Sequence, residues 1–474
     1  MELERPSAGR PHQIGVSMHE IRDPIHGTVS FTARERAVVD HPFVQRLRHV
    51  RQLGLVSLVY PGATHDRFSH CLGAMCVVSR VWERIMETSG DVLRRHFEDF
   101  DLEYFHRLLR LAGLLHDIGH PPFSHMAESL MPKVGELELP DGWFGELDPE
   151  RRAKHEDYSV LLIGAMSEGD SSPLPPDEAQ DIASLVHYGV SPSPSWEKRY
   201  GGTDSGQVGI HRLLSSLISG ELDCDRMDYL LRDAHFTGVA YGTFDMDHLI
   251  GNLGVTESGG ILLPTVDSTA VRAFEDFLLA RYHMFLQVYL HKTALGFDRF
   301  LERAVAEGEI SLTIPTDAAS FVRLRDSTVT EALYSAAERV DGWSRRLVTR
   351  IPARSLFRAS NGNEEDRAIM SRLVKVLERR SVPFFRIDSR QYLSSSGGSS
   401  GGGSGLLVRR KMFGRIAFEP MERYSELLNK YNEIIDLSGL YVLCENALAA
   451  QRAMDELGWP IRVGMSGGKQ SRFL

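Results

Sequence analysis

The chain has 474 residues, of which 42% are hydrophobic and 25% charged, and these proportions exclude a fully disordered or fibrous protein. Its 54 Lys and Arg against 64 Asp and Glu give a net charge of −10, which argues against a nucleic-acid or membrane-binding role for the whole surface, although a local basic region stays open. The four cysteines form no CxxC pair, and no apolar run reaches the roughly 20 residues that span a bilayer. We therefore expect a soluble cytoplasmic protein that binds no membrane.

The N-terminal third has a helical pattern after a polar start. Residues 1–17 are rich in Pro and Gly and predict a mobile arm. Residues 38–53 carry one apolar stripe at helical spacing, with Asp40 at the expected N-cap and Pro42 in the first turn. Residues 68–86 and 103–120 predict two more helices, and the second is apolar on nearly all sides, as a buried helix should be.

The rest of the chain mixes further helices with a few strands. Pro, Gly, Ser and charges predict surface loops at 131–153 and 190–208. Apolar periodicity predicts helices at 155–166, 177–189 and 217–236, and one long helix without an internal Pro at 274–305. Strand patterns occur at 259–265, as part of a hairpin, and at 382–388 and 411–419.

These elements predict a mostly α fold with a small β-hairpin and a mixed α/β C-terminal part. We place a catalytic core at residues 18–330 and the C-terminal region at 331–474. Residues 394–405 contain only Ser and Gly, the composition of a flexible linker. This linker is either an engineered replacement of a native loop or a natural low-complexity segment.

The most specific local pattern is LLHDIGHPPFSH at residues 114–125. His116 and Asp117 are adjacent near the end of the buried helix, where neither belongs unless it is paired or bound to a ligand. His70, at the start of another predicted helix, and one carboxylate among residues 223, 225, 228 and 233 would complete a metal site. Two His and two Asp suit Fe, Mn, Co, Ni or Zn better than Mg, and they leave positions open for water and a phosphate oxygen.

Seven sequence blocks carry a wider resemblance. They are IRDPIHG (21–27), FVQRLRHVRQLG (43–54), YPGATHDRFSHCLG (60–73), LLHDIGHPPFSH (114–125), KHE (154–156), DCDRMDYLLRD (223–233) and RYHMFLQVYLHK (281–292). In this order they resemble the HD-domain deoxynucleoside triphosphate triphosphohydrolases of vertebrates and bacteria. The resemblance covers about residues 20–330 and implies the helical HD-domain phosphohydrolase fold.

The resemblance also implies a reaction and a ligand set. The family cleaves at the α-phosphate and releases a deoxynucleoside and intact triphosphate, for nucleotide-pool control or defence against phage. Such cleavage needs an activated water, cations along the phosphates and a proton donor for the 5′ oxygen. The implied ligands of the divalent metal are His70, His116, Asp117 and Asp225, and Mg could join as a second ion with the triphosphate.

The resemblance assigns catalytic residues in the same way. His125 is implied as the proton donor, supported by His155. Glu156 would orient the His155 imidazole and raise its pKa. His120 would lean toward the phosphates.

The substrate-binding residues follow from the same blocks. Arg67 and Arg226 are implied to contact phosphates, and Arg226 stands where vertebrate relatives have lysine, so a planar fork replaces a point charge. Tyr289 would pack against the sugar where a 2′-hydroxyl would clash, which gives a preference for deoxyribose. The remaining implied positions are Gln52 and Asp233, at the 3′-hydroxyl, and Tyr229, Arg281 and Lys292.

A regulatory site and an assembly are also implied. Asp40, Gln45 and Arg48 match a guanine-selective activator site, although Asp40 also suits a helix N-cap and the other two suit a polar helix face. Because family members form dimers, tetramers or hexamers, we expect a homo-oligomer, for which the long helix at 274–305 could supply an interface. An activating nucleotide is therefore a possible partner beside the dNTP substrate.

Two other functions remain open from the sequence. One keeps the metal site but changes the substrate, as in other HD-family nucleotide phosphohydrolases or phosphodiesterases. The other is a nucleotide-sensing or single-stranded nucleic-acid-binding module. The complete set of implied ligands together with His125 favours an enzyme, and the retained Gln52, Arg281, Tyr289 and Lys292 favour dNTP hydrolysis.

Overall fold

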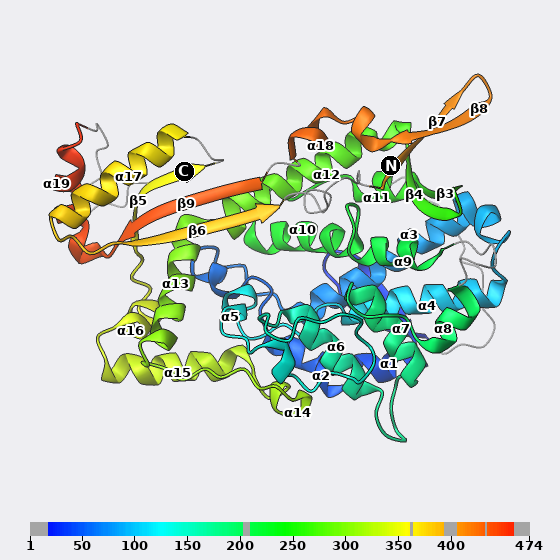
Figure 1. The fold of residues 1–474 in the computed structure, drawn as a ribbon, viewed down its shortest axis with the longest axis horizontal. Helices are drawn as coiled ribbons and strands as arrows, with labels where there is room; N and C mark the ends of the chain where they lie inside the picture. Colours follow the sequence, from blue (N-terminus) through cyan, green and yellow to red (C-terminus); the bar gives the residue numbers. More distant parts are fainter. Residues whose placement is uncertain (1–17, 202–208, 361–363, 393–404, 432–433, 459–474) are drawn as a thin grey trace, which may run out of the picture.

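The computed structural model describes residues 18–201, 209–360, 364–392, 405–431 and 434–458. The arm predicted at 1–17 and nearly all of the Ser/Gly linker at 394–405 therefore lie outside the described residues. A helical body forms one side of the molecule, and a smaller part built on strands β5, β6 and β9 forms the other (Figure 1). The predicted fold class, mostly α with a small hairpin and a mixed C-terminal part, is confirmed.

Helices of very different lengths make up the body. Its α-helices are α1 (Ala33–Val39), α2 (Pro42–Gln45), α3 (Arg67–Leu93), α4 (Asp99–Leu115), α5 (His125–Glu128), α6 (His155–Met166), α7 (Pro176–Val186), α8 (Pro194–Tyr200), α9 (His211–Ile218), α10 (Cys224–Thr237), α11 (Met246–Gly251), α12 (Val271–Met284), α13 (Lys292–Ala306) and α14 (Ala318–Phe321). The later helices are α15 (Asp326–Arg339), α16 (Trp343–Val348), α17 (Glu364–Arg379), α18 (Glu426–Tyr431) and α19 (Ala447–Asp455).

Short 3-10 segments and a π-helical segment lie between these helices. The 3-10 segments are η1 (Arg46–His49), η2 (Gly54–Leu58), η3 (Val134–Glu136), η4 (Ser268–Ala270), η7 (Met421–Arg423) and η8 (Cys444–Asn446). Segment η5 (Phe285–Tyr289) is π-helical and lies between α12 and α13. Such turns often occur at functional sites.

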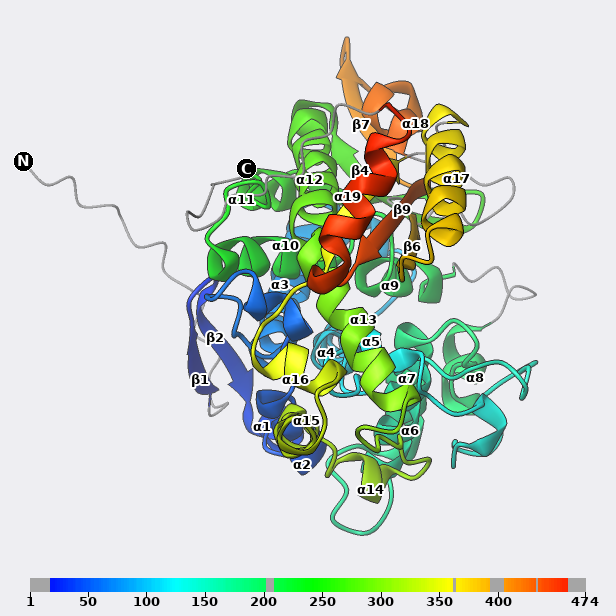
Figure 2. The same cartoon turned by 90° about the vertical axis from the view of Figure 1, so that its left-hand side faces the viewer.

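The described strands form three sheets. The antiparallel hairpin of β1 (Met18–Asp23) and β2 (Gly27–Thr32) lies along one side of the body (Figure 2). A second sheet has the order β3-β4-β7-β8, with β3 (Leu253–Ser258), β4 (Ile261–Asp267), β7 (Leu407–Met412) and β8 (Arg415–Pro420). The third has the order β5-β9-β6, with β5 (Arg354–Ser360), β9 (Ile434–Val442) and β6 (Phe385–Tyr392).

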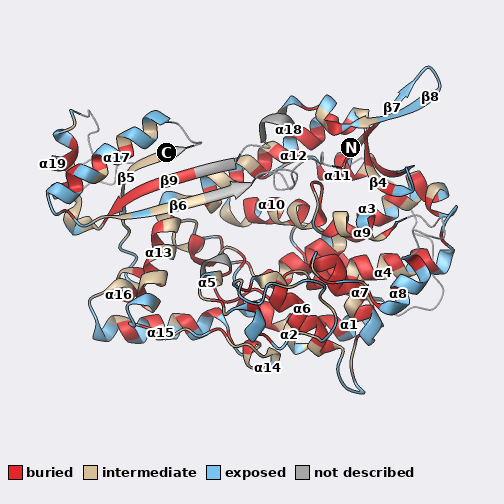
Figure 3. Cartoon of the chain, in the orientation of Figure 1, coloured by how far each residue is buried: buried red, intermediate tan, exposed pale blue. Residues whose placement is uncertain are grey.

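The core of the body surrounds helices α3 and α4, which cross it side by side. Burial is dense along α3, α4 and α6, whereas the β7–β8 hairpin projects into solvent (Figure 3). Helix α3 packs against α4, α10 and β3, so its buried first turn is held next to the end of α4 and the start of α10. Within the described ranges, no helix combines the length and apolar character that crossing a membrane requires.

Several predicted element boundaries are wrong. The stripe at 38–53 is not one helix, because α1 ends at Val39, Asp40 caps its C-terminus, and His41 is the N-cap of the short α2. The predicted helix at 217–236 is interrupted between α9 and α10, where Asp223 starts a new helix as its N-cap. The predicted loop at 190–208 contains helix α8, which the Ser193 side chain caps.

The prediction of one long helix at 274–305 is also wrong. It breaks after the π-helical η5, and the side chain of His291 accepts a hydrogen bond from the Thr293 amide to start α13. The single strand predicted at 411–419 is a hairpin, because Phe413 and Gly414 form a turn with positive φ angles between β7 and β8. The strand predicted at 382–388 begins later, at Phe385.

Candidate metal centre

The four predicted metal ligands come from three helical segments. His70 stands in the first turn of α3, and Asp225 stands in the first turn of α10. His116 is the residue that follows α4, with Asp117 directly after it. Because α3, the end of α4 and the start of α10 pack together, residues separated by more than 150 positions in sequence meet at one place.

Local sequence fixes the two helix starts. The side chain of Asp66 accepts a hydrogen bond from the Ser69 amide at 2.9 Å and caps α3. The side chain of Asp223 accepts one from the Arg226 amide at 2.8 Å and caps α10. Each cap satisfies an amide that the helix leaves without a partner. The ligands in these first turns are therefore held on well-anchored backbone.

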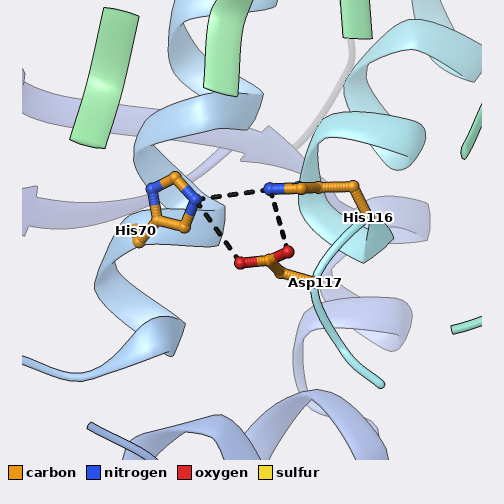
Figure 4. Close-up of side chains that lie close together, drawn as sticks. All are labelled: His70, His116 and Asp117. Atoms are coloured by element: carbon orange, nitrogen blue, oxygen red, sulfur yellow. Dashed lines mark hydrogen bonds and ion pairs between the residues drawn. The ribbon is translucent and has the colours of Figure 1, made fainter. Parts of the chain in front are cut away.

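The donor atoms of the four residues converge. The Nε2 atom of His70 lies 3.3 Å from Nε2 of His116 and 2.9 Å from Oδ1 of Asp225. The same Asp225 oxygen lies 3.4 Å from His116 Nε2. Asp117 places its two oxygens 3.7 Å from His70 Nε2 and 3.5 Å from His116 Nε2 (Figure 4). Tetrahedral ligands at about 2.1 Å from a metal lie about 3.4 Å apart, so the spacings among His70, His116 and Asp117 suit one cation. Asp225 lies at similar distances from both histidines.

The other nitrogens of the two imidazoles also fit a metal. Nδ1 of His70 lies 2.7 Å from the Asp228 carboxylate, and Nδ1 of His116 lies 2.9 Å from the Gly113 carbonyl oxygen. Both partners can only accept, so Nδ1 of each ring carries the hydrogen when the ring is neutral. The Nε2 lone pairs then face the shared point, as in metal sites whose outer contacts orient the ligands.

The electrostatics of the cluster favour an added positive charge. Burial lowers the pKa of His70, but its hydrogen bonds to Asp225 and Asp228 outweigh this and raise the pKa to about 10. Burial also opposes charge on His116, yet the carboxylates of Asp117 and Asp225 raise its pKa above the usual value. The cluster thus binds protons tightly because its carboxylates are in excess, and a divalent cation would satisfy the same imbalance.

Arg67 lies one turn before His70 and is almost fully buried. Its guanidinium donates hydrogen bonds to Oδ2 of Asp117 and, at 3.0 Å, to the hydroxyl of Ser124. The structure therefore connects this arginine directly to a predicted metal ligand. Its contact with a phosphate stays a prediction.

Next to Asp117 lies a pair of stacked histidines. The rings of His120 and His155 lie 3.8 Å apart between centroids, and their Nε2 atoms lie 3.3 and 3.9 Å from Oδ1 of Asp117. Together these three residues form a second group whose atoms could hold an ion. The carboxylate closest to His155 is Glu128, at 2.5 Å from Nδ1, whereas Glu156 is 3.5 Å away.

The expected orientation of His155 by Glu156 is thus corrected. Glu128 is near in space because α5 lies against the start of α6, but it is remote in sequence. Burial lowers the pKa of His155, and Glu156, Glu128 and Asp117 together raise it to about 9. The side chain of His125, the predicted proton donor, lies outside the described residues.

One face of α10 carries predicted ligands for both metal and sugar. Asp225, Tyr229 and Asp233 follow one another at four-residue spacing, and side chains at this spacing lie on the same helix face. Tyr289 donates its hydroxyl hydrogen to Oδ2 of Asp233 at 2.7 Å, and its ring lies 6.1 Å from that of Tyr229. The structure therefore brings these four predicted residues together.

Two arginines and a glutamine are further predicted substrate-binding residues with mostly buried side chains. Arg226 and Arg281 are mostly buried, and burial together with the charge of Arg226 lowers the pKa of Arg281. Two close buried cations would be stabilised by a polyanion. The Oε1 atom of buried Gln52 has no hydrogen-bond partner among the described residues, so it can accept one from a ligand. Lys292 is exposed at the start of α13.

The three residues of the predicted activator site are only partly brought together. Arg48 donates to Oε1 of Gln45 at 2.8 Å, and its guanidinium lies over the Phe68 ring. Asp40 instead pairs with Arg36 at 3.0 Å. This pairing agrees with the helix-end role of Asp40 rather than with an N-cap of the following helix.

The structure also identifies contacts that the sequence did not predict. Asp228 orients His70, and it is bound in turn by His26 and Arg232. His26 belongs to the IRDPIHG block, and Asp228 is one of the acidic residues on the α10 segment. Both residues lie in sequence blocks that carry the family resemblance. The contact between His26 and Asp228, however, spans 202 positions, and no local sequence pattern predicts it.

Comparisons with known proteins place the site in context. The family model for the HD domain matches residues 67–230, and the model for the HD associated region matches residues 244–380. An uncharacterized protein of Methanocaldococcus jannaschii is 32% identical over 288 residues, which is 61% of this chain and 49% of that protein. The human deoxynucleoside triphosphate triphosphohydrolase SAMHD1 is 29% identical over 377 residues, covering 72% of this chain and 55% of that protein.

The chain therefore spans about half the length of these curated relatives. Among solved structures, a hypothetical protein from Aquifex aeolicus matches over 93% of this chain and 100% of its own, with 27% identity and a TM-score of 0.67. The segments that bring His70, His116, Asp117 and Asp225 together all lie inside the HD-domain match.

Proposed function

We propose that this chain, which belongs to the HD-domain proteins, is a metal-dependent phosphohydrolase that cleaves deoxynucleoside triphosphates. The HD domain matches residues 67–230, and the HD associated region matches residues 244–380. The reaction adds water at the α-phosphorus, breaks its bond to the 5′ oxygen and releases a deoxynucleoside and triphosphate. A relative that is 29% identical carries the name of this activity.

The observation that supports this substrate is the shared face of α10. With a rise of 1.5 Å per residue, Asp225 and Asp233 are about 12 Å apart along the helix. A nucleotide lying along this face would have its α-phosphate at the metal ligands and its sugar at Tyr289 and Asp233. The polyphosphate would then extend toward the buried guanidinium of Arg67 or of Arg226.

A divalent cation held by His70, His116, Asp117 and Asp225 would supply Lewis acidity toward a phosphate oxygen. The chain supplies the rest. Arg67 would share its guanidinium between Asp117 and the substrate. His155 would hold or transfer a proton at Nε2. Its ring is oriented for this role because Glu128 binds Nδ1. The proton for the 5′ oxygen is assigned to His125 by sequence resemblance.

Selection for deoxyribose would arise at Tyr289. Its hydroxyl is tied to Asp233, which is itself bound at 2.7 Å by His65. The aromatic ring is therefore fixed and could not move aside for a 2′-hydroxyl. Gln52 would accept a hydrogen bond from the sugar through its unpartnered buried oxygen.

Product analysis tests the proposal directly. Protein loaded with Mn²⁺ or Co²⁺ is incubated with each dNTP and NTP, alone and with added dGTP or GTP. We expect deoxynucleoside and intact triphosphate, full loss of turnover in His116→Ala, and retention in His106→Gln, a half-buried histidine of α4 that contacts the Ser79 hydroxyl. Stepwise phosphate release, or equal cleavage of NTPs, would move the assignment to another nucleotide phosphohydrolase.

The same experiment tests regulation and assembly. Faster turnover on adding dGTP or GTP, abolished by Arg48→Ala, would support an activator site at Asp40, Gln45 and Arg48. Light scattering with and without nucleotide would test the proposed homo-oligomer. Tight nucleotide binding without any turnover would favour a sensor.

A further inference from the structure

Asp228 is a buried hub directly behind the metal ligand His70. Its side chain is 0% exposed, and its two oxygens each accept two hydrogen bonds. Oδ2 is bound by His70 Nδ1 at 2.7 Å and Arg232 Nε at 2.9 Å. Oδ1 is bound by His26 Nε2 at 2.6 Å and Arg232 Nη2 at 2.8 Å. A carboxylate has about four acceptor sites, so Asp228 is saturated only while His26 is present.

His26 reaches this hub from outside the matched HD domain. It stands in the turn of the β1–β2 hairpin, which lies on the flank of the body (Figure 2). Asp23 shapes the turn, because its Oδ1 accepts hydrogen bonds from the amides of Ile25 and His26 at 2.8 and 2.9 Å. Its Oδ2 accepts from Arg232 at 2.8 Å. Two residues of one turn are thus bound to the Asp228–Arg232 pair.

Helix α3 packs closely against the hub on the side of His70. A Cβ atom at Gly73, one turn after His70 on α3, would collide with Oδ1 of Asp228. The His26 side chain is 1% exposed, so water does not replace it. Its Nδ1 atom has no hydrogen-bond partner among the described residues. Because Asp228 only accepts, the hydrogen of neutral His26 lies on Nε2, and the partnerless Nδ1 is then a bare acceptor.

We propose that His26 is a positioning residue of the metal centre, which acts through Asp228 to hold the His70 ring with Nε2 toward the ion. Without His26, Oδ1 of Asp228 loses a donor in a buried place, and the carboxylate can rotate to share its remaining donors. His70 then loses its fixed partner at Nδ1 and becomes a poorer ligand. The inference rests on the metal centre of the proposed function and not on its substrate.

Metal affinity of the full chain provides the test. Co²⁺ binding is measured by competition with a chromophoric chelator, and the visible Co²⁺ spectrum reports ligand geometry. We expect His26→Leu, which keeps the bulk and removes the donor, to weaken Co²⁺ binding about 10- to 100-fold and to change the spectrum. His26→Gln, whose side-chain amide can donate from the position of Nε2, should restore affinity to within a few fold of wild type.

A matched control separates positioning from general destabilisation. His106→Leu also removes a partly buried histidine hydrogen bond, that to Ser79 at 2.8 Å, on the helix that precedes His116. We expect its Co²⁺ affinity and spectrum to stay those of wild type. Equal losses in His26→Leu and His106→Leu, or wild-type affinity in a folded His26→Leu, would overturn the proposal.

The wild-type protein gives a second readout that needs no variant to fold. In the Zn²⁺-loaded chain with ¹⁵N-labelled histidine, nitrogen shifts should show His26 as the Nε2–H tautomer with a hydrogen-bonded proton. An Nδ1–H tautomer would overturn the proposal. Neither measurement contains nucleotide, so failure of dNTP hydrolysis would count against the proposed function and leave this inference standing.

Discussion

Tyr289 donates its hydroxyl hydrogen to Asp233 over 2.7 Å, and this bond joins the π-helical turn η5 to the helix that carries Asp225. Burial and the charge of Asp233 raise the pKa of Tyr289 well above its ordinary value, so the phenol stays a donor at neutral pH. The other oxygen of Asp233 is bound by His65. The tyrosine ring is therefore fixed relative to the metal ligands.

Two substitutions at Tyr289 should separate the ring from its hydroxyl. Tyr289→Ala removes the ring that would meet a 2′-hydroxyl, so the ratio of kcat/KM for dATP over ATP should fall about 10-fold or more. Tyr289→Phe keeps the ring and should lose less of this ratio, while its kcat/KM for dATP falls because Asp233 loses a donor. An unchanged ratio in Tyr289→Ala would place sugar selection elsewhere.

The two carboxylates near His155 should contribute unequally to turnover. Glu128 lies 2.5 Å from Nδ1, and Glu156 lies 3.5 Å away. We therefore expect Glu128→Gln to lower kcat on the order of 10- to 100-fold and Glu156→Gln to have a smaller effect. Steady-state kinetics of the two variants, with Co²⁺ affinity as the control for an intact metal centre, decides between them. A larger loss in Glu156→Gln would restore the pairing inferred from sequence.

The sequence predicted the parts of the site that depend on local pattern. His116 and Asp117 stand out because they interrupt a buried apolar helix, and His70 stands out at a helix start. The choice of Asp225 among four nearby acids rests on family resemblance and stays a prediction, and in the structure its Oδ1 lies 2.9 Å from His70 Nε2 and 3.4 Å from His116 Nε2. The role of Asp228 depends on a histidine 202 positions away, and no short-range pattern encodes such a contact.

The fold likewise contains some elements that local sequence patterns predict and others that they do not. Helices with long apolar patterns were predictable, because burial of one face, as in α3, or of nearly all sides, as in α4 and α6, determines them. The break in the segment 274–305 was not, since the π-helical turn leaves the apolar periodicity of its sequence intact. The hairpin of β7 and β8 differs from the single predicted strand because Phe413 occupies a turn position that usually takes Gly or Asn.

Metal removal should lower thermal stability as well as activity. A ligand that binds only the folded state at 100 times its Kd adds about 2.7 kcal/mol to the free energy of unfolding. Calorimetry should therefore give a lower Tm after chelator treatment, and Mn²⁺ or Co²⁺ should restore it. His70→Ala should show no metal-dependent change in Tm, whereas His106→Gln should respond like wild type. Equal responses of the two variants would contradict the ligand assignment.

Acid should remove the contribution of one buried ion pair remote from the site. Glu35 is buried; burial alone would raise its pKa, but Arg110 and the Thr32 cap outweigh this and lower the pKa below 4.5. A lowered carboxylate pKa stabilises the fold above the unfolded-state value and loses this effect as pH falls through the folded-state value. Glu35→Gln should cost about 3 kcal/mol near pH 7, and the difference from wild type should shrink below pH 4.5.

Urea unfolding at several pH values measures this difference. The exposed pair of Asp91 and Arg95, 3.7 Å apart, provides the control. Asp91→Asn should change the free energy of unfolding by less than about 1 kcal/mol at every pH. A constant difference between wild type and Glu35→Gln from pH 7 to pH 3 would show that the ionised carboxylate does not stabilise the fold.

The path of the chain between β6 and β9 has a consequence for how the molecule can be divided. These strands are antiparallel neighbours, with Tyr392 opposite Ile434, yet β7, β8 and α18 lie between them in sequence. Of these, β7 and β8 join the other sheet, where β7 pairs with β4. A cut between Tyr392 and Gly405 would give two fragments that hold each other in two separate sheets. The second would supply β7 to pair with β4, and β9 to lie between β5 and β6. Such fragments should reassemble when expressed apart, so that neither the metal centre nor its flanking hairpin requires an unbroken chain.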